Sequence, residues 1–252
     1  MALNAKKAAG GNGGGGTKQQ PIAPGTYPAR LVQIIDLGVQ DMSSPRYGDK
    51  PPRQNIQLTW ELVDEFMLDE DGNEQEDKPR WLSEQMPLHN LKADKAKSTQ
   101  RYYALDPKED HDGDFSELLG MPANVLVTTY QVKSGPNAGT ERNKVDSVAA
   151  MRPRDAKNCP PLVNEPKLFT LDDPDMDVFM SLPDFLQDKI KGNLEFRGSP
   201  LEAILNGGKA TPQGDEEKES EEAPKPKRKA RKPEPEPEPD FEDDEEDELP
   251  WE

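Results

Sequence analysis

The sequence predicts a mainly β fold in which five strands roll into a barrel, a helix lies between the third and fourth strands, and a helical extension follows. The strongest signal is at residues 53–67, where Ile56, Leu58, Trp60 and Leu62 occupy every second position. That period of two is typical of a half-buried strand. Four further strand-like segments surround it, separated by turns rich in Gly, Pro and Asp.

Composition divides the chain into four segments. They are a flexible Gly-rich arm at 1–25, the barrel at 26–152, an irregular and helical extension packed on the barrel at 153–206, and a disordered charged tail at 207–252. Residues 209–252 contain eight Lys and Arg against eighteen Asp and Glu. Neither end has enough apolar surface to offset the entropy of folding, so we expect both to be disordered.

The first strand is predicted at Tyr27–Val39, and it is apolar on both faces near its middle. Gly38 indicates a bulge or bend close to its end. The loop that follows is rich in Pro, Gly and Ser and carries Arg46, Tyr47, Lys50 and Arg53. It is either a solvated loop or a basic loop beside a nucleic-acid groove.

Asp71 and Gly72 predict a hairpin after the central strand, and the third strand is expected at Arg80–His89. Parity there places Leu82 and Met86 on one face and Trp81 on the other. Trp81 is therefore either a base-stacking residue or a rim residue covered by the extension. Trp60 shares its parity with core residues, and we expect it to be buried.

The rest of the chain continues this order. Residues 90–105 carry several cations and predict a helix that Pro107 ends, with one of Tyr102 and Tyr103 packed inward. A short helical turn at 114–119 precedes strands at 122–132 and 142–151. In the extension, apolar residues repeat at helical spacing from Val178 to Ile190, and Ser199 is a candidate N-cap.

Several function classes are disfavoured by what the sequence lacks. Cys159 is the lone cysteine, so no internal disulfide can form, and a reducing compartment fits. There is no apolar run of about 18 residues and no signal-peptide core, so we expect a cytoplasmic protein. His89 and His111 are the two histidines, and no phosphate-binding Gly-rich motif is present. We therefore expect no cofactor and no enzyme activity; a metal-dependent nuclease, using the abundant carboxylates, is a minor alternative.

Three strands, a helix and two strands is the chain order of the five-stranded OB barrel, whose second and third strands and flanking loops bind oligonucleotides. The sequence also resembles phage-encoded single-stranded DNA-binding proteins of the OB-fold type. The resemblance rests on Pro24–Gly38, Asn55–Glu65, Phe115–Thr128 and the acidic end with its apolar tip Leu249–Trp251. It implies coating and protection of single-stranded DNA in phage replication or recombination, in the cytoplasm of a bacterial host.

Cations and aromatic residues of the predicted barrel are the candidates for contacting single-stranded DNA. A base stacked on an aromatic ring contributes about 1–3 kcal/mol, and cations add a salt-dependent attraction to phosphates. The candidates are Arg46, Tyr47, Lys50, Arg53, Arg80, Trp81, Arg101, Tyr102, Lys133, Arg142 and Lys144.

The acidic tail is expected to dock replication or recombination proteins through Leu249, Pro250 and Trp251. This tip is similar to the apolar tips of bacterial single-strand-binding tails, although Glu252 follows the aromatic residue here. The tail should also compete with phosphates for the same groove.

The net charge of −18 argues against nucleic acid at first sight. A local patch decides binding, however, because net charge governs solubility and non-specific association. The same charge leaves open a different class of function, in which the chain is an acidic interaction protein that mimics DNA or acts as a chaperone for basic proteins.

Overall fold

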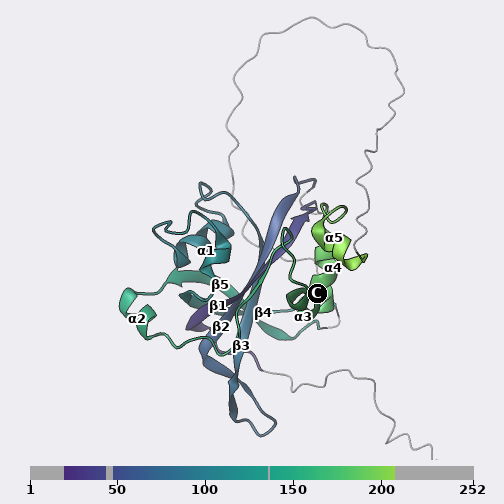
Figure 1. The fold of residues 1–252 in the computed structure, drawn as a ribbon. Coiled ribbons are helices and arrows are strands. Elements are labelled where there is room, and N and C mark those ends of the chain that lie inside the picture. Colours follow the sequence, from purple (N-terminus) through teal and green to yellow (C-terminus); the bar gives the residue numbers. More distant parts are fainter. Residues whose placement is uncertain (1–19, 44–47, 136, 208–252) are drawn as a thin grey trace, which may run out of the picture.

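A computed structural model describes residues 20–43, 48–135 and 137–207 of the chain (Figure 1). Most of the Gly-rich arm, part of the first loop and the charged tail lie outside this part, and with them Arg46, Tyr47, Leu249, Pro250 and Trp251. No helix among the described residues has the length and apolar character needed to cross a membrane.

The predicted order of three strands, a helix and two strands is confirmed. The strands are β1 (Gly25–Gln40), β2 (Arg53–Leu68), β3 (Glu74–Pro87), β4 (Pro122–Gln131), β5 (Glu141–Ala150) and β6 (Lys167–Phe169). The helices are α1 (Lys97–Leu105), α2 (Pro153–Asn158), α3 (Met176–Ser181), α4 (Asp184–Lys191) and α5 (Pro200–Leu205), with a 3₁₀ turn η1 (Phe115–Leu118). Two elements differ in extent from the prediction: β3 starts nearer the hairpin, at Glu74, and α1 starts only at Lys97.

The strands form one six-stranded sheet in the order β3-β2-β1-β4-β5, with β6 added to β1. All pairs along this path are antiparallel, and β6 is parallel to β1. The bulge predicted at Gly38 is present: the β1–β2 register shifts between Asp36 and Gly38, and Gly38 has a φ of 74°. The Asp36 carboxylate accepts the Gly38 N–H at 2.9 Å, which stabilises this bend.

The predicted closure of the sheet into a barrel is not confirmed. β3 and β5 are the two edges of the path, and no ladder joins them among the described residues. Side chains bridge this seam instead. At one end Arg101 of α1 donates to Glu84 on β3 at 2.9 and 3.0 Å and to the Asp146 carbonyl on β5 at 3.0 Å.

Residues 20–22 bridge the other end of the seam. Asn143 on β5 accepts from the Ile22 N–H and donates to the Ile22 carbonyl, both at 2.9 Å. Arg80 on β3 donates to the Gln20 carbonyl at 2.6 Å. The sheet is therefore open in its backbone hydrogen bonds, while its two edges are held near each other by side chains.

β1 has an apolar core on each face, as predicted. Leu31 and Ile34 pack with Trp60 in the first core, and the register shift between Leu31 and Gln33 explains why two residues three apart share a face. Ile35 and Leu37 lie in the second core, which the extension completes with Phe169, Phe179, Leu182, Leu186, Ile190 and Leu201. The extension thus packs on the outer face of β1, and Figure 1 shows α3, α4 and α5 on the side of the sheet opposite α1 and α2.

The segment that leads into the extension is fixed to the sheet by an arginine on β1. Arg30 donates to the carbonyls of Gly120, Cys159 and Pro160, at distances from 2.6 to 3.0 Å. Three bonds from one planar guanidinium fix the direction in which the chain leaves β5. The capping prediction at α5 is also confirmed, since Ser199 accepts the Glu202 N–H at 3.1 Å.

Candidate nucleic-acid interface

Trp81 is the exposed tryptophan of the described sheet. It projects from β3 away from the core that contains Met86, and it is 39% exposed, whereas Trp60 is fully buried. Its indole N–H donates to the Glu61 carboxylate at 3.0 Å. The ring therefore lies at the margin of the extension, accessible to solvent and fixed in orientation.

Glu61 organises this margin, a role that no pattern in the sequence indicates. Its side chain is fully buried on β2, and besides Trp81 it accepts the Val163 N–H at 2.7 Å and the Asn164 side-chain amide at 2.7 Å. A weaker bond from the Asn164 backbone N–H, at 3.3 Å, completes the set. One carboxylate thus holds both the aromatic ring and the chain that enters β6.

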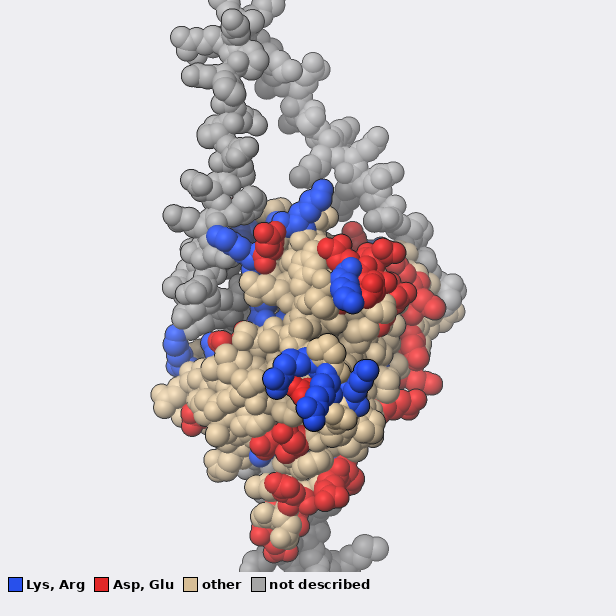
Figure 2. All heavy atoms as spheres, turned by 90° about the vertical axis from the view of Figure 1, so that its left-hand side faces the viewer, with Lys and Arg blue, Asp and Glu red and all other residues tan. Residues whose placement is uncertain are grey.

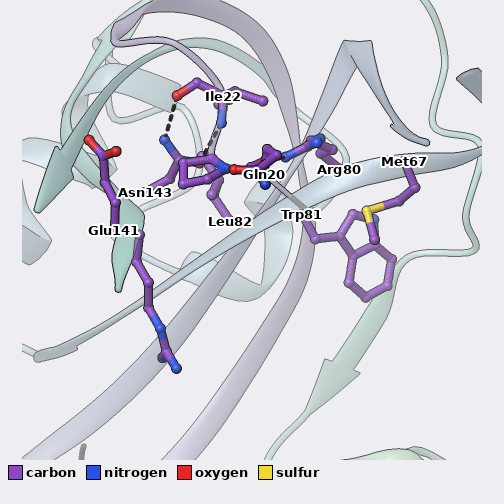
Figure 3. A pocket seen from close by; sticks show the side chains of 10 residues that line it. Gln20, Ile22, Met67, Arg80, Trp81, Leu82, Glu141 and Asn143 are labelled. Carbon is purple, nitrogen blue, oxygen red and sulfur yellow. Dashed lines mark hydrogen bonds between the residues drawn. The ribbon is translucent and has the colours of Figure 1, made fainter. Parts of the chain in front are cut away.

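A hollow of about 240 Å³, which we call the seam pocket, lies on one side of Trp81 (Figure 3). It is formed by β3, β5 and residues 20–22. In Figure 3 Arg80, Trp81 and Met67 lie on one side of the pocket, and the paired Ile22 and Asn143 lie on the other. Arg142 and Glu141 of β5 complete the charged part of the lining.

The seam pocket brings together three of the predicted site residues, namely Arg80, Trp81 and Arg142. Arg80 donates to the carbonyls of Phe66 at 3.2 Å and Gln20 at 2.6 Å, so its guanidinium also has a structural role. Arg142 is exposed on β5. Since it stands opposite Tyr130 on β4, and Lys144 stands opposite Thr128, the two cations share one face of this strand pair.

Trp81 also lines a second hollow of about 420 Å³, which we call the outer groove. Its floor is the outer face of β1, β2 and β3, and its wall is the extension. The polar floor is formed by Gln33, Gln57, Ser83 and Gln85, and the wall by Lys167, Ser181, Pro183, Phe185 and Leu186. Trp81 lines both hollows, so one aromatic ring is accessible from the seam pocket and from the outer groove.

Two lysines from the extension border the outer groove. Lys167 donates to the Ser181 hydroxyl at 3.0 Å, and Lys189 donates to the Gln85 side-chain oxygen at 2.6 Å. Burial lowers the pKa of Lys189, because its charged form is poorly solvated there. An anion placed beside the ammonium group would oppose this shift and stabilise the charged form.

Two exposed aromatic residues are not among the predicted candidates, and of the two only Phe185 lines the outer groove. Phe185 on α4 is 52% exposed and Tyr130 on β4 is 37% exposed. A signal for Phe185 existed: the helical spacing of Leu182, Leu186 and Ile190 defines the buried face and leaves Phe185 outside it. An apolar ring off the apolar face of a helix is a candidate for contact with a ligand.

Other predicted residues lie outside both hollows. Lys50 and Arg53 are exposed before and at the start of β2, and Lys133 is exposed in the turn after β4. They occupy the first loop and the last loop of the sheet, but the linings of the seam pocket and the outer groove do not include them. Their contact with nucleic acid stays a prediction.

The prediction that Arg101 and Tyr102 contact nucleic acid is wrong, because both are buried. Arg101 is 1% exposed and faces Glu84, whose carboxylate also binds Lys97 at 3.3 Å. Tyr102 packs edge-on against Phe115, with ring centroids 5.4 Å apart. Its pKa is raised to about 12, first by burial and then by its hydrogen bond to Asp106.

Charge is unevenly distributed over the surface. Figure 2, which views the side that carries α1 and α2, shows Lys and Arg gathered near the middle of this face and Asp and Glu at its lower end and upper right. Three exposed cations outside the predicted candidates lie at and around α2, namely Arg152, Arg154 and Lys157. Near the hairpin end of β2, partial burial disfavours the charged carboxylates and is the largest cause of the raised pKa of Asp64 and of Glu65.

Comparison with known proteins does not identify the chain: no family model, curated protein or solved structure matches it. Within the described ranges, no three His, Cys, Asp or Glu side chains are grouped closely enough to hold a metal ion.

Proposed function

We propose that this chain is a sequence-tolerant single-stranded DNA-binding protein. One observation carries the proposal: Glu61 fixes an exposed tryptophan that lines two hollows, and the lining of each hollow includes a cation. A fixed ring loses little entropy when a base stacks on it, and nearby cations attract the phosphates on either side. Coating of unpaired strands requires this combination, which favours no particular base sequence.

The topology supports an OB-type interpretation of the same surface. The OB barrel is a partly open five-stranded sheet that binds oligonucleotides on its second and third strands. Here β3 carries Trp81, β2 carries Glu61, and the open seam between β3 and β5 forms one of the hollows. Together with the resemblance to phage single-stranded DNA-binding proteins, this supports a role in phage replication or recombination, with the acidic tail as the docking segment for partner proteins.

A fluorescence titration of the full chain tests the proposal. Trp251 lies in the tail, so a Trp251→Phe variant leaves buried Trp60 and exposed Trp81 as reporters. We expect oligo-dT to quench the emission, and the affinity to fall as salt rises. Absence of binding at low salt, in the full chain and after removal of the tail, would contradict the proposal.

The net charge of −18 favours one rival, an acidic protein that binds basic proteins. Co-precipitation with basic proteins, combined with no affinity for oligo-dT, would support this rival.

A further inference from the structure

The outer groove has a feature that general attraction to phosphates does not require, namely amide groups with unused donors. The side-chain oxygen of Gln57 accepts from Gln85 at 2.8 Å, and that of Gln33 accepts from Thr59 at 3.1 Å. These bonds leave the Nε2 group of Gln57 and of Gln33 without an acceptor among the described residues. Both residues line the outer groove.

These two donors are open to the groove. Gln57 is 4% exposed and Gln33 is 7% exposed. Within the described part of the chain, Thr128 Oγ1 is the buried side-chain polar atom that lacks a partner, so neither Nε2 group is sealed from solvent. A carbonyl oxygen of a ligand would replace water at each donor, and a hydrogen bond exchanged in this way contributes about 0.5–1.5 kcal/mol net.

The walls of the outer groove fit a flat ring. Trp81 lies at one border and Phe185, 52% exposed, lies on the wall of α4. The volume of about 420 Å³ falls within the roughly 300–1,000 Å³ of small-molecule sites. Glu84 is also in the lining, but its carboxylate is bound by Arg101, Lys97 and Trp60, which limits its repulsion of an anion.

We propose that the outer groove is a base-binding subsite, in which one unpaired base stacks on Trp81 and Phe185 and its carbonyl oxygens accept from the amides of Gln57 and Gln33. Lys167 lines the groove and Lys189 binds Gln85 at its floor, so both place positive charge near the phosphates beside that base. The subsite favours thymine, which has carbonyl acceptors where adenine has an exocyclic donor. This inference rests on the proposed function and adds to it a preference among bases, with α4 of the extension as part of the interface.

The stacking half of the proposal is tested with Phe185→Ala in the full chain, measured by anisotropy of labelled oligo-dT and oligo-dA of about 16 nucleotides. We expect both affinities to fall by about 5- to 150-fold, which corresponds to about 1–3 kcal/mol for one stacked base. Met180→Ala is the matched control, because Met180 is 65% exposed on α3 and outside the groove lining; it should change neither affinity. A strand of abasic units offers no base to stack, so Phe185→Ala should leave the affinity for such a strand unchanged.

The amide half is tested with Gln57→Met and Gln33→Met, neutral changes that keep much of the side-chain volume. Each should lower the ratio of dT to dA affinity by about 2- to 12-fold, which is the net contribution of one hydrogen bond. The ratio is informative because backbone flexibility also favours dT, and these substitutions leave flexibility unchanged.

The outcomes separate the two proposals. If the unmodified chain binds oligo-dT while Phe185→Ala binds equally well, the base subsite is refuted and the proposed function stands. An unchanged dT to dA ratio in both glutamine variants likewise refutes the amide contacts. If the unmodified chain binds neither strand, the proposed function itself fails.

Discussion

Replacing Arg101 by Met should destabilise the fold, because Arg101 lies in the interior and not on the DNA-binding surface. Arg101 is 1% exposed and binds the buried Glu84 through two bonds of 2.9 and 3.0 Å. Without the guanidinium, Glu84 keeps the Trp60 N–H at 3.0 Å and partly exposed Lys97 at 3.3 Å. Removing one partner of a buried ion pair costs about 3–5 kcal/mol. At about 2–4 °C per kcal/mol for a domain of this size, the melting temperature should fall by about 6–20 °C.

Urea unfolding and calorimetry measure this loss, and oligo-dT binding is measured at a temperature where both proteins are folded. Arg142→Met is the matched control, because Arg142 is exposed and lines the seam pocket. It should change stability by no more than about 0.5 kcal/mol and should weaken binding, with the slope of log affinity against log salt reduced by about 0.7. If Arg101→Met kept its melting temperature but bound DNA more weakly, our assignment of Arg101 to the interior would be refuted.

Three further predictions concern the hydrogen bonds of Glu61, the tail and the stability at alkaline pH. Glu61→Ala should free the chain at 163–164, which limited proteolysis would detect as faster cleavage there. It should also weaken oligo-dT binding, because Trp81 loses its fixed orientation. An unchanged digestion pattern would contradict the proposed role of Glu61. Deletion of 233–252, which contains twelve acids and no base, should tighten oligo-dT binding, whereas unchanged or weaker binding would exclude self-restraint. The folded-state pKa of Tyr102, about 12, exceeds its ordinary value of 10.0, so the stability it contributes is present below pH 10 and is lost as pH rises toward 12. Tyr102→Phe should remove that pH dependence in urea titrations.

Local patterns predicted the strands and the faces of their residues, because parity along a strand depends only on neighbouring positions. Trp60 in the core and Trp81 outside follow from this rule. The inward orientation of the Arg101 side chain could not be predicted in the same way, since it depends on Glu84, which lies seventeen positions earlier on a different element. A helix with several cations appears solvent-facing until the strand beneath it is known to offer a carboxylate.

The outer groove could not be predicted from the sequence, for a related reason. Its wall comes from β6 and α4, which follow the barrel region in sequence and pack back on it through the second core. β6 has only three residues and carries no periodic signal, so its parallel pairing with β1 could not be inferred. Of the two interpretations left open for Trp81, coverage by the extension is not what the structure shows, since the ring is 39% exposed. The extension instead adds Phe185 and Lys167 to the lining of the outer groove, and Lys189 binds Gln85 at its floor.

The anionic composition and the proposed interface can be reconciled by the range of electrostatic forces. Charges beyond about 8–10 Å are largely screened at physiological salt, so a bound strand is affected mainly by the cations that border the two hollows. These are Arg80, Arg142, Lys167 and Lys189. At about 0.7 counterions released per neutralised phosphate, four contacts give a slope of log affinity against log salt of about −3 at the steepest. A much steeper slope would mean that cations elsewhere, such as Arg152, Arg154 and Lys157 at and around α2, hold the phosphates, and the interface would have to be assigned to that face.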